Sequence, residues 1–102
     1  MNLNCYRYVI SIAENASISK AAKDLFISQP ALTKYLNKLE EELGVRLFDR
    51  TVNPIRITYA GEVYVQEGRK ILEMQNRLNQ HIGEISHLQR GRLTIGINSE
   101  RG

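Results

Sequence analysis

The sequence contains a single cysteine, Cys5, and no long apolar run. One thiol cannot form a disulfide within the chain, which fits a reducing compartment, and we interpret Cys5 as a small buried residue of a first helix. No apolar segment approaches the roughly 18 residues that a membrane span needs, and the N-terminus lacks the basic-then-apolar order of a signal peptide. These absences predict a cytoplasmic protein with no membrane partner.

The chain also lacks the residue sets of common active sites. No Ser/His/Asp, Cys/His or paired-carboxylate set falls within one plausible pocket, and no glycine-rich loop precedes a helix to hold a nucleotide. His81 and His87 are six residues apart and point to different sides of one helix, which disfavours zinc. We therefore predict no enzyme, no metal site and no cofactor.

What is present is an ordinary globular composition with a small excess of positive charge. The 102 residues are 42% hydrophobic and 25% charged, enough for one domain with a modest core. A net charge of +3 suits a polyanionic partner without proving one, because phosphate binding depends on local clustering of charge.

The segment from Ser17 to Gly44 predicts two helices separated at residues 26–28. Ser17 and Ser28 are suited to cap the two helix starts, Pro30 fits a first turn, and Gly44 fits a C-terminal stop. The second helix carries an apolar stripe at helical spacing, which we expect to be buried: Leu32, Leu36, Leu39 and Leu43. Its opposite side carries residue types that read DNA base edges and phosphates: Pro30, Thr33, Lys34, Asn37, Lys38 and Glu41.

A helix over residues 2–15 precedes this pair and completes a three-helix core. We expect Asn15 to end it in a left-handed conformation, because asparagine tolerates that conformation better than alanine. Ala21 and Ala22 then allow the close helix approach of a helix-turn-helix.

After Gly44 the apolar period changes to two. Val45 and Leu47 alternate with Arg46, and Ile55 and Ile57 alternate with Arg56, which predicts a β-hairpin wing over about residues 45–57. The turn falls at residues 53–54. We expect Phe48 to pack beneath the hairpin, and its arginines to meet phosphates.

From Tyr59 to about Gln89 no proline interrupts a helical pattern, and Thr58 can cap its start. Apolar residues recur every seven positions, which predicts pairing with a second copy of the helix; the expected contact residues are Ile71, Met74, Leu78, Ile82 and Ile85. Gly61, Gly68 and Gly83 weaken the helix by about 1 kcal/mol each relative to alanine. Residues 90–97 return to alternation and suggest a linker that leads into a strand.

Together these residues resemble the LysR-type transcriptional regulators over nearly the whole chain. The matching features are Leu3, Ala13-Glu14, Ser17, Ala21-Ala22, Leu25, Ser28-Gln29-Pro30-Ala31, Leu39-Glu40, Leu43-Gly44, Leu47-Phe48-Asp49-Arg50, Thr58 and Ala60-Gly61. The resemblance implies a mainly α fold, with a winged helix-turn-helix over residues 1–58 (helix-turn-helix about 18–37), a dimerisation helix over 59–89, and a hinge and first strand of an effector-binding domain over 90–102.

The resemblance also implies a function. It predicts a bacterial transcription regulator that binds inverted-repeat promoter DNA as a dimer, or as a higher oligomer, and that senses a small-molecule effector through a further C-terminal domain. The implied DNA contacts are Ser28, Gln29, Pro30, Ala31, Thr33, Lys34, Asn37, Lys38, Arg50, Asn53 and Arg56. Arg50 resembles the family's backbone-binding arginine. The wing tip, residues 52–55, is poorer in glycine and arginine than the family pattern, which leaves Arg56 as its cationic contact.

Several alternatives remain open from the sequence. Lys34 and Lys38 could belong to a solvated helix face, and Arg50 could pair with Glu40 or Glu41 and brace the wing. The whole chain could be a protein-interaction module that recruits a partner through its long helix, or a fragment of an enzyme subunit.

Overall fold

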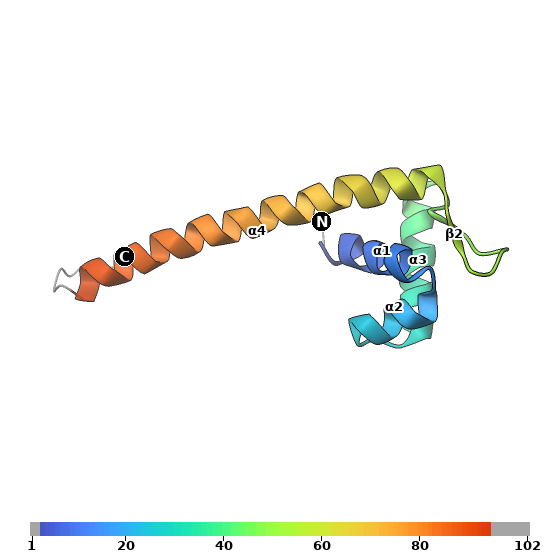
Figure 1. Cartoon of the computed structure of the whole chain (residues 1–102), viewed down its shortest axis with the longest axis horizontal. Coiled ribbons are helices and arrows are strands. Elements are labelled where there is room, and N and C mark those ends of the chain that lie inside the picture. Colours follow the sequence, from blue (N-terminus) through green and yellow to red (C-terminus); the bar gives the residue numbers. More distant parts are fainter. Residues whose placement is uncertain (1–2, 95–102) are drawn as a thin grey trace. The chain divides into compact units, whose positions relative to one another are not determined.

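The computed structural model describes residues 3–94 of the chain, with side chains described through residue 88. The elements are α1 (Asn4–Asn15), α2 (Ile18–Leu25), α3 (Gln29–Leu43), β1 (Phe48–Asp49), β2 (Arg56–Ile57) and α4 (Tyr59–Thr94) (Figure 1). This order confirms the predicted mainly α fold with a helix-turn-helix followed by a hairpin wing. The chain divides into two compact units, and the boundary between Leu72 and Glu73 lies inside α4.

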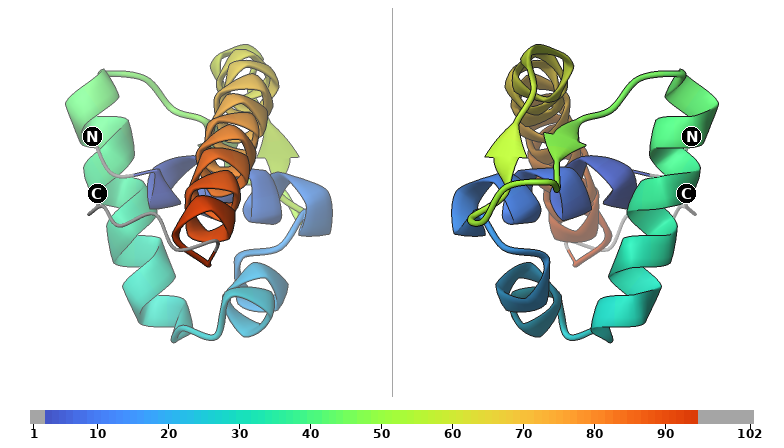
Figure 2. Two further views of the ribbon diagram at one scale, coloured as in Figure 1. Left: turned by 90° about the vertical axis from the view of Figure 1, so that its left-hand side faces the viewer. Right: turned by 90° about the vertical axis from the view of Figure 1, so that its right-hand side faces the viewer.

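The first unit is built around α1, which packs against both α2 and α3 (Figure 2). Ala21 and Ala22 of α2 are buried, and their short side chains allow α2 to lie close to the other helices, as predicted. Cys5 is buried as predicted. The remaining core side chains are Tyr6, Val9, Ile10, Ile12, Leu32, Leu36, Leu47, Phe48 and Val65.

The helix starts follow the predicted caps. The Ser17 hydroxyl accepts a hydrogen bond from the Lys20 N–H at 3.1 Å, and the Ser28 hydroxyl accepts one from the Ala31 N–H at 3.2 Å. Each bond satisfies a backbone donor that has no partner inside its helix. Gly44 ends α3 with φ of 75°, a conformation that favours glycine.

The predicted end of α1 is wrong by one residue. Asn15 stays in the helix, and Ala16 adopts the left-handed conformation with φ of 50°. The Asn15 amide is engaged elsewhere, because its Nδ2 donates to the Ser11 carbonyl at 2.9 Å and to the Asp24 carboxylate at 3.1 Å. The first bond holds Asn15 within α1, and the second ties the end of α1 to α2, so the left-handed turn falls on the next residue.

The apolar stripe of α3 is shorter than predicted. Leu32 and Leu36 are buried and Leu39 is partly buried, but Leu43 is 46% exposed. The last turn of α3 extends beyond the core, so Leu43 lacks the neighbours that would cover it. One turn after Leu36, the inward position is occupied by Glu40 instead of leucine.

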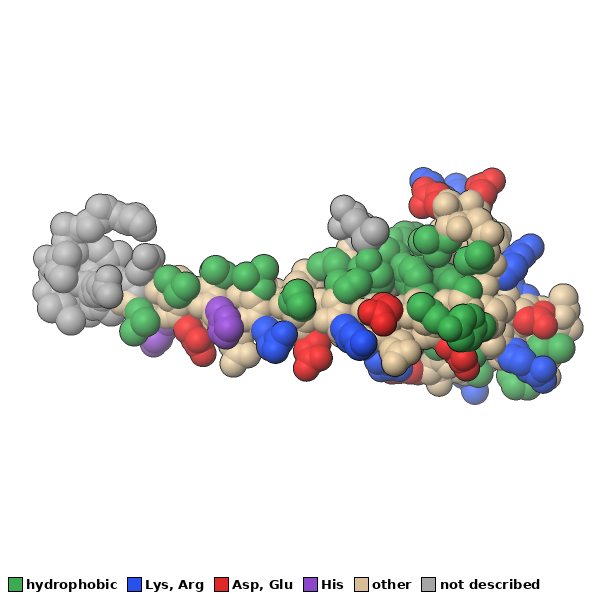
Figure 3. All heavy atoms as spheres, turned by 90° about the horizontal axis from the view of Figure 1, so that it is seen from above, with side chains coloured by type: hydrophobic (Ala, Val, Ile, Leu, Met, Phe, Trp, Pro, Cys, Tyr) green, Lys and Arg blue, Asp and Glu red, His purple; other side chains and the backbone are tan. Residues whose placement is uncertain are grey.

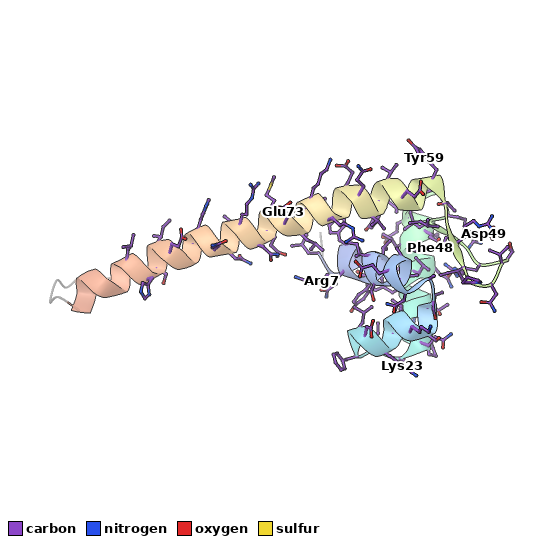
Figure 4. The ribbon with its side chains drawn as sticks, viewed as in Figure 1. Arg7, Lys23, Phe48, Asp49, Tyr59 and Glu73 are labelled. Atoms are coloured by element: carbon purple, nitrogen blue, oxygen red, sulfur yellow. The ribbon has the colours of Figure 1, made fainter. Side chains whose placement is uncertain are left out.

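The wing is present, but its strands have only two residues each. Phe48 pairs with Ile57 and Asp49 pairs with Arg56 in an antiparallel register. The predicted strand from Val45 is wrong, because β1 begins at Phe48. The Leu47 carbonyl still accepts from the Thr58 N–H in the register of the hairpin, but the Leu47 N–H bonds the Glu40 side chain, so regular pairing stops there. Phe48, labelled in Figure 4, is buried as predicted, and its backbone N–H donates to the Glu40 carboxylate of α3 at 3.3 Å.

Helix α4 begins as predicted and continues further. The Thr58 hydroxyl accepts from the Gly61 N–H at 3.0 Å and donates to the Arg46 carbonyl at 2.6 Å. The helix runs to Thr94, so the predicted end at about Gln89 and the predicted linker and strand over residues 90–97 are wrong as far as Thr94. A few alternating residues cannot outweigh a helix that no proline interrupts. The rest of the predicted strand lies outside the described residues.

Within the first unit, the start of α4 packs on α1 and the wing. A Cβ at Gly61 would lie 2.1 Å from the Leu47 carbonyl oxygen, and one at Gly68 would lie 3.1 Å from the Tyr6 ring. The rings of Tyr6 and Tyr64 are 5.5 Å apart, and burial raises the pKa of the Tyr64 hydroxyl above its usual value. Among the described helices, none has the length and apolar character needed to span a membrane.

Candidate nucleic-acid interface

One side of α3 gathers most of the residues predicted to contact DNA. Gln29, Pro30, Ala31, Lys34, Asn37 and Lys38 are exposed, and Thr33 is partly buried. Five of them line one shallow hollow on the surface: Gln29, Pro30, Thr33, Lys34 and Asn37. Ser28 lies at the N-terminal edge of this side, where its hydroxyl caps the helix. We call the following α3 residues the recognition face: Gln29, Pro30, Ala31, Thr33, Lys34, Asn37 and Lys38.

The recognition face has the chemistry of a major-groove reader. Its two lysines supply positive charge, and the amides of Gln29 and Asn37 can donate and accept hydrogen bonds with base edges. An α-helix fits the roughly 12 Å width of the major groove. The face therefore combines phosphate attraction with side chains that can distinguish base pairs.

Behind the recognition face, a buried carboxylate joins α3 to the wing. Glu40 is 5% exposed, and its Oε2 accepts from the backbone N–H groups of Leu47 at 2.7 Å and Phe48 at 3.3 Å. Its Oε1 accepts from Arg50 Nη2 at 2.6 Å and from Arg46 Nη1 at 3.5 Å. Both carboxylate oxygens are thus used, which offsets the unfavourable burial of a charge.

The partner of Glu40 also touches the recognition face. Arg50 donates from Nη1 to Asn37 Oδ1 at 2.6 Å, while its Nη2 binds Glu40. The Arg50 side chain is only 24% exposed. Of the two sequence alternatives for its ion pair, the structure shows Glu40. The predicted contact of Arg50 with a DNA phosphate stays a prediction.

The remaining predicted contacts lie on the wing. Asn53 and Arg56 are exposed, and the Asn53–Pro54 peptide bond is cis. Across the hairpin from Arg56, the hydroxyl and backbone N–H of Thr51 both donate to the Asp49 carboxylate. These hydrogen bonds hold the pKa of Asp49 below its usual value, and the charge of Arg56 contributes in the same direction. The ionised Asp49 partly offsets the positive charge that Arg56 brings to the wing.

Helix α4 carries the predicted dimerisation residues on its surface. Ile71, Met74, Leu78, Ile82 and Ile85 are all exposed, as is Leu88. Figure 3 shows hydrophobic side chains along one edge of this helix and charged and histidine side chains along the opposite edge. The described residues contain no group of three or more His, Cys, Asp or Glu side chains placed to hold a metal ion.

From the sequence, Glu40 was considered only as one of two possible partners of Arg50, and its link to Asn37 through Arg50 was not predicted. A signal was available, because Glu40 continues the spacing of four residues that joins Leu32 to Leu36 on the buried side of α3. A carboxylate on that side requires a buried partner. The identity of that partner depends on the path of the chain after Gly44.

Comparison with known proteins gives a consistent picture. The sequence model described as "Bacterial regulatory helix-turn-helix protein, lysR family" matches residues 3–62. The chain is 36% identical over 99 residues to the HTH-type transcriptional regulator BudR of Klebsiella aerogenes, covering 97% of this chain and 69% of BudR. It is 32% identical over 96 residues to the HTH-type transcriptional regulator XapR of Escherichia coli strain K12, covering 94% of this chain and only 33% of XapR.

A solved structure is also similar. The crystal structure of the BenM_DBD/benA site 1 DNA complex superimposes with a TM-score of 0.81 at 34% identity, covering 84% of this chain and 97% of that one. The likeness therefore extends from the sequence to the three-dimensional fold.

Proposed function

Because the chain belongs to the lysR family of bacterial regulatory helix-turn-helix proteins, we propose that it binds promoter DNA sequence-specifically and regulates transcription. The observation that carries this proposal is the recognition face: an exposed helix side with two lysines, two amides and a hydroxyl, on a fold shared with a protein whose structure was solved on DNA. In this arrangement α3 enters the major groove, and the wing lies along the neighbouring backbone.

We propose that the chain acts as a dimer through α4. The exposed apolar residues recur every seven positions, and a second copy of the same helix would cover them. Two recognition faces related by a two-fold axis match an inverted repeat in the DNA. A higher oligomer and an effector-sensing C-terminal domain stay predictions of the family resemblance.

The relatives compared here are transcriptional regulators, and we propose that this chain likewise has no catalytic role. We also propose that it works in the bacterial cytoplasm, where the DNA lies. An interaction module that recruits a partner through α4 is the main competing function, and it does not require the recognition face.

A titration separates these functions. Fluorescently labelled chain is titrated with a library of promoter duplexes and with one random duplex, at two salt concentrations. We expect a few promoters with a shared inverted repeat to bind preferentially, and the affinity to fall steeply as salt rises. Equal binding to every duplex, or no binding, would favour the interaction module.

A pair of variants tests the recognition face in the same assay. Lys34→Ala is expected to weaken binding to all duplexes and to reduce the slope of log affinity against log salt by about 0.9. Lys70→Ala makes the same chemical change on α4, where Lys70 pairs with Glu67, and is expected to leave binding unchanged. Equal effects of the two variants would contradict the role given to Lys34.

A further inference from the structure

We propose that Glu40 and Arg50 are positioning residues that orient the Asn37 amide, so that Asn37 donates hydrogen bonds to a purine in the major groove. This inference rests on the proposed DNA-binding function and assigns one of its specificity-determining residues. It differs from the sequence prediction, in which Arg50 contacts the DNA backbone.

The chain of contacts begins at a fixed point. Glu40 is buried and accepts two backbone N–H bonds from Leu47 and Phe48, so its carboxylate cannot rotate without losing them. Its other oxygen holds Arg50 Nη2 at 2.6 Å. The Arg50 Nε is buried and has no hydrogen-bond partner among the described residues, whereas the side chain as a whole is 24% exposed, so the guanidinium is covered on its Nε side and reaches the surface at Asn37.

The second contact sets the direction of the amide. Arg50 Nη1 lies 2.6 Å from Asn37 Oδ1. A guanidinium can only donate hydrogen bonds, so the atom of Asn37 that faces it must be the oxygen, whichever way the amide is drawn. The amide is planar, and its Nδ2 is therefore directed away from Arg50.

This orientation has a consequence for base recognition. A free asparagine can bind adenine in two ways at once, because Nδ2 donates to N7 and Oδ1 accepts from N6. In this chain Arg50 occupies one of the two acceptor positions of Oδ1, so the two Nδ2 hydrogens are the groups that Asn37 presents most freely to a base. Guanine offers acceptors at both N7 and O6, whereas cytosine offers only a donor. Asn37 therefore favours guanine and disfavours cytosine.

The charges support the same division of roles. The Glu40 carboxylate lies 2.6 Å from the Arg50 guanidinium and 3.5 Å from that of Arg46, so it offsets part of the charge of Arg50 and makes Arg50 a weaker counter-charge for a phosphate. Lys34 and Lys38 on the recognition face are exposed, and no ion pair is seen for either among the described residues. Phosphate attraction is accordingly assigned to the lysines, and amide orientation to Arg50.

The test compares base preferences of the 102-residue chain and its variants. Duplexes are selected from a randomised library with the unaltered chain, and affinities are then measured for all four base pairs at each position of the selected site. Asn37→Asp keeps an oxygen acceptor for Arg50 and removes the Nδ2 donor. We expect the base preferred at one position of each half-site to change from guanine to cytosine, because the N4 amine of cytosine can donate to the new carboxylate. The ratio of the affinities for the two bases should change by on the order of 10-fold. Asn79→Asp adds the same charge at an exposed site on α4 and is expected to change no base preference.

A second variant tests the positioning role itself. Arg50→Gln removes the fixed donor, and we expect it to relax the preference at the same position as Asn37→Asp while the salt slope stays unchanged. Arg69→Gln, an equal loss of charge on α4, serves as its control. A uniform loss of affinity for all duplexes with Arg50→Gln, and a slope lower by about 0.9, would show a phosphate contact and overturn the inference.

The outcomes separate this inference from the proposed function. If the unaltered chain selects sites but Asn37→Asp leaves every base preference unchanged, the orientation of Asn37 is not used, and only the inference fails. If the unaltered chain selects no sequence, the proposed function fails and the inference fails with it. Because Asn37→Asp retains the partner of Arg50, this test does not depend on how well Arg50→Gln folds.

Discussion

Glu40 is the residue on which the junction between α3 and the wing depends. Its carboxylate replaces the strand partner that the Leu47 N–H would otherwise need, and it compensates the charge of Arg50. A buried ion pair adds little net stability compared with apolar packing, but removal of one member leaves the other charge buried and uncompensated. The junction is therefore sensitive to this one side chain.

We predict that Glu40→Gln lowers the free energy of unfolding by about 3 kcal/mol, because the neutral amide cannot compensate Arg50 and cannot accept all the hydrogen bonds of the carboxylate. Urea denaturation followed by circular dichroism measures the change. Glu41→Gln makes the same substitution at the next, exposed position and is expected to shift stability by less than about 0.5 kcal/mol. Similar values for the two variants would show that the buried network contributes little.

Single residues also show where sequence reasoning stops. The caps at Ser17, Ser28 and Thr58 were predictable, because each acts on backbone groups only a few residues away. The left-handed residue after α1 was not predicted correctly. Its position depends on the bond from Asn15 to Asp24, which exists only when α2 packs beside α1.

Helix α4 illustrates the same distinction for a secondary-structure element. Its start and helical character were predictable from Thr58 and from the absence of proline, but its glycines were interpreted only as weak helix formers. Gly61 and Gly68 instead lie where a side chain would meet Leu47 or Tyr6, whereas Gly83 has open space around it. Chemically identical residues thus differ in role, because only two of them face another element.

We predict opposite effects from two identical substitutions in α4. Gly61→Ala should destabilise the chain by about 1–3 kcal/mol, because its Cβ would overlap the Leu47 backbone oxygen and the gain in helix propensity is smaller than this strain. Gly83→Ala should stabilise the helix by up to about 1 kcal/mol. Thermal unfolding followed by circular dichroism compares them. A stabilising Gly61→Ala would mean that α4 does not approach the wing as closely as described.

For the assembled protein, the exposed apolar residues of α4 are the feature that a single chain leaves unexplained. Met74, Leu78, Ile82 and Ile85 are each more than half exposed, and they recur along one side of the helix. Water contact with such a row is unfavourable, at about 25 cal/mol for each Å² of apolar surface. A second copy of the helix would remove this row from water.

We predict that Leu78→Asp converts the dimer to a monomer, because a carboxylate cannot be buried in an apolar helix pair without a partner. Sedimentation equilibrium measures the change in mass. The monomer should also lose its preference for inverted repeats over single half-sites, by at least about 10-fold, since two linked recognition faces bind more tightly than one. Asn79→Asp, at the adjacent position, should remain dimeric. A Leu78→Asp variant that remains dimeric would place the interface elsewhere.

The local patterns of the sequence were sufficient for the order of the helices, for the caps at their starts, for the presence of a wing and for the exposed side of α3, because helical spacing, capping and turn chemistry act over a few residues. They also sufficed for the family, whose motifs lie at fixed spacings along the chain. The contacts from Glu40 to Arg50 and Asn37, the short strands and the roles of the glycines were decided by the tertiary structure. Each of these depends on contacts between groups from different elements, and the spacing of residues along the chain does not determine which of the possible contacts forms.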